Sequence, residues 1–379
     1  MTPPMYLDLH ILQTIPPANV NRDDAGSPKS AVYGGVRRSR VSSQAWKRAT
    51  RQAFAVHLPE AERATRTKKI ESLLAARLKA RFALDAPVAA RLAEAMLAPL
   101  GIKAGKKEAE TSYLLFFGYR QLEAVVDLVA EDIDALIKLE GTDLAAAVGG
   151  LPVKACLGTG HPLDVGLFGR MVANLSELNV DAAVQVAHAL STHGVEVEFD
   201  YFTAVDDENT AEQAGAGMIG TIEFNSATLY RYATVGLHQL HANLTDPGAA
   251  VQALDLFVDA FCRSVPGGHQ STFAHRTLPH LVVAVLRDDQ PINLVGAFER
   301  PVAADAGIAE ASMRRLAAEH HAVTVTWGGT PRLLVASGHA SEPATAASLT
   351  EAFGALVPFA EMCEAVQRAA AAWYGEVLV

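Results

Sequence analysis

The sequence has few cysteines and lacks a long apolar run. Its 379 residues include 3 cysteines, Cys156, Cys262 and Cys363, and no CxxC pair, which argues against a disulfide framework and against a thiolate zinc site. No apolar run approaches the ~18 residues that a membrane-spanning helix needs. Prolines interrupt the N-terminal apolar stretch, where a signal peptide would need a basic start and an unbroken apolar segment. We therefore expect a cytoplasmic protein with no membrane partner.

The motifs of common cofactor and enzyme sites are absent or stand in the wrong context. A GxGxxG pattern at residues 215–220 follows a polar segment and precedes a predicted strand, whereas a dinucleotide site needs a strand before the glycines and a helix after them. The pairs His238–His241 and His320–His321 have no further ligand types nearby, and neither HExxH, GxSxG nor a P-loop occurs. We expect no cofactor, no metal site and no catalytic residue.

What the sequence does contain is an uneven distribution of charge. The chain as a whole carries −10, which by itself argues against nucleic acid as a partner. Residues 1–120, however, hold 20 of the 32 Lys and Arg against 10 of the 42 Asp and Glu, so they carry +10 and the remainder carries −20. Such asymmetry suggests a polyanion-binding surface on the N-terminal part, although a solvated basic helix face would give the same counts.

Patterns of apolar residues predict an α+β fold. In the N-terminal part we expect a strand at 5–14, a loop at 15–35, a strand at 37–41 and a helix that begins at Ser42 or Ser43 and ends near residue 57. Helices should follow between residues 60 and 100, near 181–190, at 249–264 and at 344–378. The further strands are predicted at 195–205, 219–240, 281–286, 292–298, 323–327 and 332–336. One sheet should therefore be assembled from both ends of the chain, around a helical insertion.

The basic residues of the segment 19–54 (NVNRDDAGSPKSAVYGGVRRSRVSSQAWKRATRQAF) are arranged in a way that would allow them to bind phosphate groups. Backbone amides and Ser42 at the helix start can donate to a phosphate. Lys47 and Arg51, one helical turn apart, can reach successive phosphates of a strand. The Gly–Gly turn would let a ligand approach the backbone closely. This combination favours a site that binds the sugar–phosphate backbone of a nucleic acid.

This stretch also resembles the N-terminal signature of the CasC family, the repeated backbone subunit of the type I-E CRISPR surveillance complex (Cascade). The shared pattern is NRDD…K…A.YGG.RR.R.SSQ..KRA.R. Later segments agree with the same family in the same order, so the resemblance spans most of the chain: 164–171 (DVGLFGRM), 194–207 (GVEVEFDYFTAVDD), 219–233 (IGTIEFNSATLYRYA), 265–272 (VPGGHQST) and 291–302 (PINLVGAFERPV).

The resemblance implies a non-catalytic RNA-binding subunit shaped like a hand. Its palm would be a modified RRM-like (ferredoxin-like) sheet built from residues 1–60 and 181–379. The fingers would be a helical insertion at 61–180, and the thumb a β-hairpin at 201–224. Several copies would stack along one CRISPR guide RNA, together with other Cascade subunits, and present the guide for pairing with target DNA in antiviral defence.

The resemblance also assigns residues to these contacts. Palm contacts to the RNA backbone would come from Lys29, Ser42, Gln44, Lys47 and Arg51, and Arg22 joins them because it lies in the same basic loop. Met171 would be the apolar finger residue beside a displaced base. Phe202 and Thr203 would be the thumb residues that interrupt the base stack of a neighbouring copy's RNA segment. Met171 and Phe202 could equally be ordinary core residues, and basic helices at 61–107 could line the path of target DNA.

Three alternative functions stay open from the residues alone. The first is a metal-independent endoribonuclease of the same RRM-like superfamily that uses His10 or His269, although neither histidine stands in a recognisable acid–base pair. The second is an oxidoreductase that relies on the GxGxxG pattern. The third is an interaction scaffold that binds no RNA, for which the charge asymmetry would be incidental.

Overall fold

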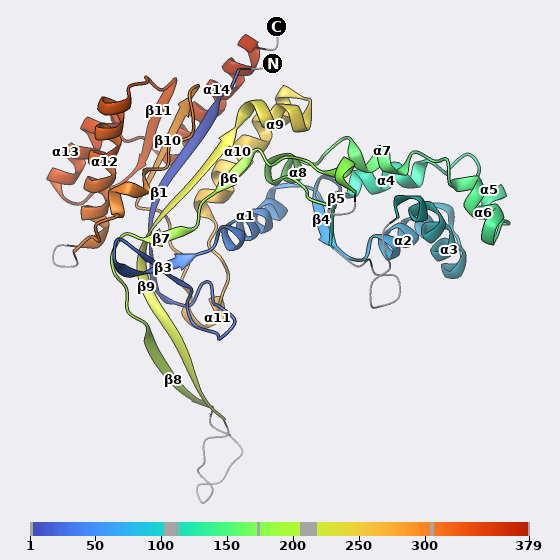
Figure 1. Ribbon diagram of the computed structural model, residues 1–379, viewed down its shortest axis with the longest axis horizontal. Coiled ribbons are helices and arrows are strands. Elements are labelled where there is room, and N and C mark those ends of the chain that lie inside the picture. Colours follow the sequence, from blue (N-terminus) through green and yellow to red (C-terminus); the bar gives the residue numbers. More distant parts are fainter. Residues whose placement is uncertain are drawn as a thin grey trace, which may run out of the picture. The chain divides into compact units, whose positions relative to one another are not determined.

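The computed structural model describes residues 3–101, 111, 114–172, 175–204, 218–303 and 307–377, which form a mixture of helices and antiparallel sheet (Figure 1). The chain divides into two compact units. The first consists of residues 1–53, 185–238 and 254–379, and the second of residues 54–184 and 239–253. This division differs from the predicted one at residues 54–60, 181–184 and 239–253, which cluster with the helical insertion.

The first unit is built on a nine-stranded sheet. Its main path runs in the order β11 (Leu333–Gly338), β10 (Leu281–Arg287), β1 (Tyr6–Ala18), β9 (Met218–Gly236), β7 (Ala189–Ser191), β3 (Val36–Val41) and β2 (Ser30–Tyr33). β6 (Val184–Val186) and β8 (Glu198–Ala204) pair with β9 beside that path. β1 lies antiparallel between β9 and β10, with Leu9 opposite Ala233 and Ala284. The predicted assembly of one sheet from both chain ends is thus confirmed.

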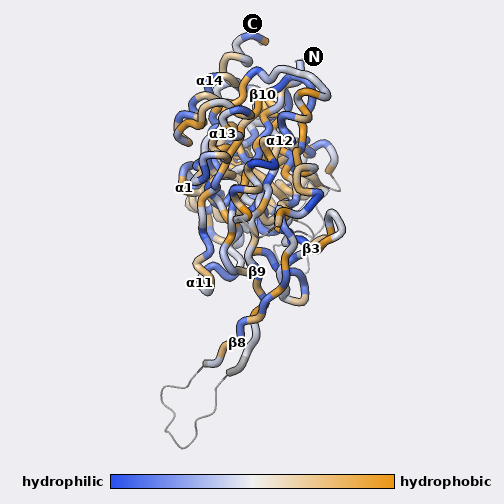
Figure 2. The backbone as a smooth tube through the Cα atoms, turned by 90° about the vertical axis from the view of Figure 1, so that its left-hand side faces the viewer, coloured by the Kyte–Doolittle hydropathy of each residue, from blue (hydrophilic) through white to orange (hydrophobic). Residues whose placement is uncertain are grey.

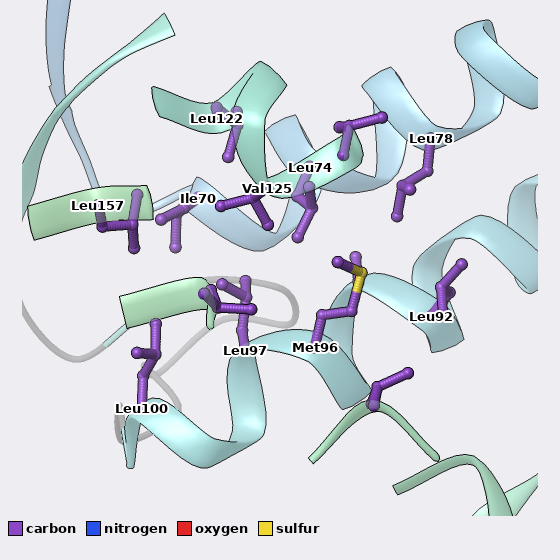
Figure 3. Close-up of a cluster of buried hydrophobic side chains, with 14 of the residues drawn as sticks. Ile70, Leu74, Leu78, Leu92, Met96, Leu97, Leu100, Leu122, Val125 and Leu157 are labelled. Carbon is purple, nitrogen blue, oxygen red and sulfur yellow. The ribbon is translucent and has the colours of Figure 1, made fainter. Parts of the chain in front are cut away.

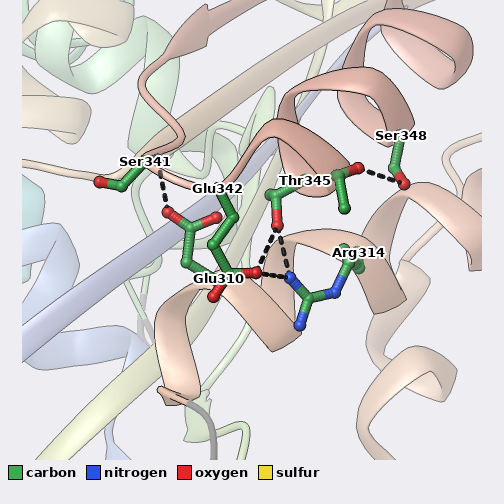
Figure 4. Close-up of polar contacts among 7 residues, drawn as sticks. Glu310, Arg314, Ser341, Glu342, Thr345 and Ser348 are labelled. Carbon is green, nitrogen blue, oxygen red and sulfur yellow. Dashed lines mark hydrogen bonds and ion pairs between the residues drawn. The ribbon is translucent and has the colours of Figure 1, made fainter.

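Helices α12 (Ile308–Trp327) and α13 (Pro343–Phe353) cover one face of this sheet, together with the 3-10 helix η5 (Leu294–Phe298). Leu12 of β1 packs there in one buried cluster with Leu316 and Phe353. Polar contacts join the two helices (Figure 4): Arg314 pairs with Glu342 at the start of α13 and also donates to Thr345.

On the opposite face of the sheet, Arg231 of β9 contacts α1 (Ser43–His57) and α10 (Pro247–Arg263). Further helices along the chain are α9 (Leu237–Leu244), the short α11 (Gln270–Phe273) and α14 (Phe359–Val377). Arg231 joins α1 and α10, because its guanidinium lies 3.8 Å from the ring centroid of Trp46 and donates to the carbonyl of Phe261. It also donates to Gln13 of β1 at 2.6 Å. Burial lowers the pKa of Arg231 to about 9. This buried cation fixes α1, the basic helix, on the sheet.

A hairpin formed by β8 and the first part of β9 projects from the sheet (Figure 2). Its register runs from Glu198 opposite Phe224 to Ala204 opposite Met218. The predicted thumb falls on this hairpin. Its connection, residues 205–217, lies outside the described residues, and so do the first two glycines of the GxGxxG pattern.

The second unit is mainly helical. Its elements are η1 (Glu60–Glu62), β4 (Ala64–Thr67), α2 (Ile70–Phe82), α3 (Ala86–Leu97), η2 (Ala98–Leu100), β5 (Leu115–Gly118), α4 (Tyr119–Asp127), α5 (Ile133–Leu136), α6 (Gly141–Val148), α7 (Val153–Gly158), α8 (Leu163–Phe168) and η3 (Ser176–Leu178). Its core is aliphatic, with Leu74 and Leu78 of α2 facing Leu92 and Met96 of α3 (Figure 3). Residues 239–253 join this unit because Asn243 donates to the carbonyls of Gly166 and Asp181 at 2.8 and 2.7 Å.

The predicted loop at 15–35 contains the end of β1 and all of β2. Three of the predicted helices and strands are also wrong. Residues 181–190 form no helix but carry two three-residue strands, β6 and β7, which are too short for their alternation to stand out. Residues 292–298 form η5 after Asn293, whose side chain accepts from the amide of Val295, instead of a strand. Residues 323–327 complete α12, so the helix that precedes them overrides their β-branched composition. Within the described ranges, no helix is long and apolar enough to span a membrane.

Candidate nucleic-acid interface

The start of α1 is organised by two side chains. Ser42 precedes the helix and its Oγ accepts from the amide of Ala45 at 3.3 Å, which confirms the predicted N-cap. The amide of Ser42 in turn donates to Oδ1 of Asn21 at 2.9 Å, so the loop after β1 is tied to the helix. The hydroxyl hydrogen of Ser42 is not used in this cap, and it can donate to a ligand.

A groove of about 770 Å³ opens beside this helix start, within the first unit. Three segments form it: the loop after β1, one face of α1 and the loop before α11. The polar residues that line it are Asn21, Arg22, Ser42, Gln44, Arg48, Gln52 and His269, with Gly267 and Gly268 between them. The groove thus combines two guanidinium groups with hydroxyl and amide donors, which is the mixture that a sugar–phosphate backbone requires.

Close backbone packing shapes the loop before α11. A Cβ on Gly268 would lie 2.5 Å from the carbonyl oxygen of Val20, so a side chain there would push the loop away from the strand. His269 follows in the left-handed region, with φ +50, and it lies half-buried on the groove wall. Glycine at 268 therefore lets the two loops meet and places His269 beside Asn21 and Arg22.

The groove gathers only part of the predicted set. Arg22, Ser42 and Gln44 line it, whereas Lys47 and Arg51 lie half-buried on the adjacent stripe of α1 and Lys29 lies half-buried next to β2. Arg22 and Arg48 are exposed and pair with no carboxylate in the described ranges. Two cations without counter-charges leave the groove positive, which suits a polyanion.

Met171 lies on the surface, contrary to the alternative of a core position. Its side chain is 85% exposed, although the backbone on both sides is fixed. Arg170 and Val180 exchange backbone hydrogen bonds of 2.9 and 2.8 Å, and the amide of Val172 donates to Asn179 at 2.6 Å. An apolar side chain held rigidly in water is suited to contact a partner.

The hairpin presents aromatic residues on both faces. Phe202 is half-buried because it folds over the strand partner Gly220, where a Cβ would lie 2.3 Å from its ring. Thr203 is exposed. On the same face as Thr203, Phe199 and Tyr201 are 67% and 64% exposed. Phe202 therefore packs within the hairpin, and Phe199 and Tyr201 are the more accessible aromatic surfaces.

A family model for CT1975-like proteins matches residues 7–361 of this chain. The chain belongs to the CT1975-like family. Among solved structures, it is similar over 96% of its length to a chain of a "CRISPR RNA-guided surveillance complex, pre-nicking", with 33% identity, a TM-score of 0.84 and 100% of that chain covered. A chain of a "CRISPR RNA-guided surveillance complex" has 30% identity and a TM-score of 0.76, with 96% and 99% covered. A separate comparison with curated proteins found no match.

Two groove residues on α1 of this CT1975-like chain, Arg48 and Gln52, were not predicted from the sequence. Gln44, Arg48 and Gln52 follow each other at intervals of four, as Lys47 and Arg51 do. Both sets form polar stripes on α1, so periodicity does not distinguish which stripe lines a groove. The loop at residues 267–269 contacts the loop after β1, which is far away in the sequence, and no local sequence pattern predicts this contact.

Five basic residues of the second unit form ion pairs with acids among the described residues. Arg77 pairs with Glu123 at 2.7 Å, and the others are Arg81 with Asp127, Arg91 with Glu140, Arg120 with Glu62 and Lys154 with Glu177. Residues 54–184 and 239–253 hold 15 Lys and Arg against 18 Asp and Glu, a net charge of −3. Half of the predicted balance of +10 lies in residues 1–53, which hold 8 Lys and Arg against 3 acids, and the other half, in residues 54–120, is offset by the acids of 121–184 and 239–253.

His10 is unsuited to RNA chemistry, because it is 2% exposed beneath α12. Its Nδ1 lies 2.9 Å from the hydroxyl of Tyr230, and burial lowers its pKa to about 3. Of the two predicted candidates for an endoribonuclease, only His269 reaches an open surface. No group of three or more His, Cys, Asp or Glu is arranged to hold a metal ion in the part of the chain that the structure describes.

Proposed function

We propose that this chain is a non-catalytic CRISPR RNA-binding backbone subunit of a Cascade complex of type I-E. Copies of it would line up along the guide RNA, together with other Cascade subunits, and present the guide for base pairing with target DNA. Membership of the CT1975-like family and the similarity to chains of RNA-guided surveillance complexes support this proposal.

The observation that carries the proposal is the groove beside α1. It offers Arg22, Arg48 and the hydroxyl of Ser42 for phosphate oxygens, and the amides of Gln44 and Gln52 for hydroxyl groups of the sugar. Among the described residues that line it there is no Phe, Tyr or Trp on which a base would stack and no carboxylate that would select a base. Such a surface binds any guide sequence equally, so specificity would come from Watson–Crick pairing of the guide.

In this proposal the first unit is the RRM-like palm, the second unit the fingers and the hairpin of β8 and β9 the thumb. Met171 would contact a displaced base from the fingers, and the hairpin residues Phe202 and Thr203 would interrupt the base stack of the next copy's segment. The exposure of Met171 and Thr203 supports these roles. The half-buried position of Phe202 assigns it a supporting part, in which its ring stiffens the hairpin against Gly220.

The first test is whether the purified chain carries nucleic acid. We expect a high ratio of nucleic-acid to protein absorbance that a high-salt wash lowers, since phosphate contacts are screened by salt. Lys47→Ala combined with Arg51→Ala should weaken binding similarly for unrelated guide sequences and lower the salt dependence of the affinity. The matched control removes two cations elsewhere in the same unit, Arg263 and Arg368, which pair with acids. A loss restricted to some sequences would contradict the proposal.

One observation favours a second candidate, the metal-independent endoribonuclease. His269 lies in the groove, where a bound phosphodiester would pass close to its ring. Incubation of the purified chain with a repeat RNA and a metal chelator tests this activity. Cleavage that disappears in His269→Ala would establish the enzyme and refute the non-catalytic role.

A further inference from the structure

A cluster of two basic residues and a histidine lies beside the start of α1. It consists of Lys29, Arg40 and His188, all in the first unit. The amide of Arg40 donates to the carbonyl of Lys29 at 2.9 Å, which places these two residues opposite each other at the end of the β2–β3 pair. Like charges in opposite positions destabilise a sheet. A pairing of this kind is therefore expected where an anion binds between the two charges.

His188 completes the cluster from the connection between β6 and β7. Its Nδ1 lies 3.3 Å from Nη1 of Arg40 and 3.4 Å from the amide nitrogen of Ser43. Guanidinium and backbone N–H groups can only donate, so Nδ1 accepts both bonds and carries no proton. The ring is therefore neutral, with its proton on Nε2.

The Nε2–H group of His188 can donate a hydrogen bond to a ligand. The residue is exposed, and Nε2 has no hydrogen-bond partner among the residues that the structure describes. Burial, Arg40 and Lys29 each lower the pKa of His188, and no carboxylate contributes. The ring thus stands between two positive charges with no acid to balance them. Its Nε2–H is an uncharged donor on an exposed residue.

We propose that Lys29, Arg40 and His188 bind one phosphodiester of the guide RNA, with Lys29 and Arg40 supplying charge and Nε2–H of His188 a neutral hydrogen bond. This inference rests on the proposed function and adds Arg40 and His188 to the RNA-binding set. The cluster is continuous with the groove, because the amide of Lys29 donates to the carbonyl of Asn21 at 2.9 Å and Asn21 lines the groove. A strand leaving the groove would pass the cluster with its next phosphates.

The test separates the two kinds of contact by their response to salt. Binding of a labelled repeat–spacer RNA to the full chain is measured across a salt series, at a pH above the ordinary value of histidine. Arg40→Gln should weaken binding about tenfold at low salt and reduce the slope of log affinity against log salt by about 0.7. His188→Ala should weaken binding about threefold and leave the slope unchanged, because it removes no charge.

A neighbouring arginine on the same strand supplies the matched control. Arg37 lies on β3 on the face opposite to that of Arg38 and Arg40, is exposed, and donates to Ser30 at 2.9 Å. Arg37→Gln should leave the slope as in the wild type. Equal slopes for Arg37→Gln and Arg40→Gln would overturn the inference while wild-type binding upholds the proposed function. A wild-type chain without salt-sensitive RNA binding would overturn both.

Melting temperatures show whether each variant is folded. If Arg40→Gln unfolds, Lys29→Gln replaces it, because Lys29 makes no hydrogen bond to His188. The same reduction of the slope is expected there. An unchanged slope in Lys29→Gln would refute the shared phosphate site.

Discussion

In the second unit, four arginines (Arg77, Arg81, Arg91 and Arg120) form ion pairs with carboxylates, whereas among the described residues no arginine of the segment 22–48 in the first unit forms one. Arg77 and Arg81 meet Glu123 and Asp127 in ion pairs. Arg38, by contrast, is buried and donates only to backbone carbonyls. Local counts of charge therefore do not locate a polyanion site. Such a site needs cations that the fold leaves without acids.

The comparison also shows how a glycine and a buried cation shape the basic segment. Gly34, at φ +60, would place a Cβ 1.6 Å from the carbonyl oxygen of Glu299. The close approach predicted for the Gly–Gly turn is thus made by the chain's own backbone and not by a ligand. Arg38 secures this contact by donating to Phe298 and Glu299 at 2.9 and 3.2 Å. Part of the basic signature is consequently structural.

The largest effect is expected from Arg38→Ala, because this substitution removes the buried arginine that has a structural role in the basic segment. The carbonyls of Ser191 and Phe298 would lose their buried donor, so unfolding should cost about 3–5 kcal/mol less free energy. Urea unfolding measures the change. Arg37→Ala is the control on the same strand, and because Arg37 is exposed it should cost at most about 0.5 kcal/mol. Similar losses in the two variants would show that Arg38 is not a special anchor.

A pH series tests the buried polar groups of the sheet. His10 has a folded pKa of about 3, below its ordinary value of 6.5. The unfolded chain therefore takes up a proton that the folded chain does not. The contribution of neutral His10 to the free energy of unfolding is therefore complete above pH 6.5 and is lost as the pH falls toward 3. The expected slope is about 1.4 kcal/mol per pH unit for one proton.

The matching variant is His10→Gln, which removes the titration and keeps an acceptor for the hydroxyl of Tyr230. Urea unfolding at several pH values should show a slope that is smaller by that amount between pH 6.5 and 3. An unchanged slope would mean that other groups account for the acid sensitivity.

Much of the fold was predictable, because its signals are local. The alternation in β1 and the serine before α1 identify those elements without tertiary information. The acids at 123, 127 and 140 are different, since they lie 46, 46 and 49 residues from the arginines that they neutralise. A division of the charge count at residue 120 separates these partners. The sequence therefore predicts a basic helical insertion, while the folded second unit is nearly neutral.

The candidate site was predictable only as a segment. Arg22 and Ser42 were found because the basic segment is continuous in sequence, and Gln44 was found through the family resemblance. Arg48 was missed because its stripe has the same period as that of Lys47. His188 was missed because it reaches the start of α1 from a distant connection. Long-range packing decides which of several equivalent polar groups meet, and no spacing encodes it.

Exchanging single arginines sharpens the contrast between the units. Arg48→Ala should weaken guide RNA binding about tenfold and lower the salt slope by about 0.7, because it removes an unpaired cation from the groove. Arg77→Ala should change the affinity less than about twofold, since Glu123 already balances that charge. Binding of one labelled RNA to both variants, across a salt series, gives the answer. A larger effect of Arg77→Ala would move the RNA site to the second unit.

The smallest change in stability is expected from Met171→Ala, and two methionines of the second unit make the comparison direct. Met171 is 85% exposed and Met96 is fully buried between α2 and α3. Met96→Ala should lower the free energy of unfolding by about 2–5 kcal/mol, whereas Met171→Ala should change it by less than about 0.5 kcal/mol.

A fluorescent base analogue, placed at each guide position in turn, reports whether the base at that position is unstacked. We expect one position to lose its unstacking signal in Met171→Ala and to keep it in Met171→Leu. Leucine retains an apolar side chain of similar size that can contact the base, whereas alanine does not. If the alanine variant leaves every position unchanged, Met171 has no contact with a displaced base, and its exposure serves another partner.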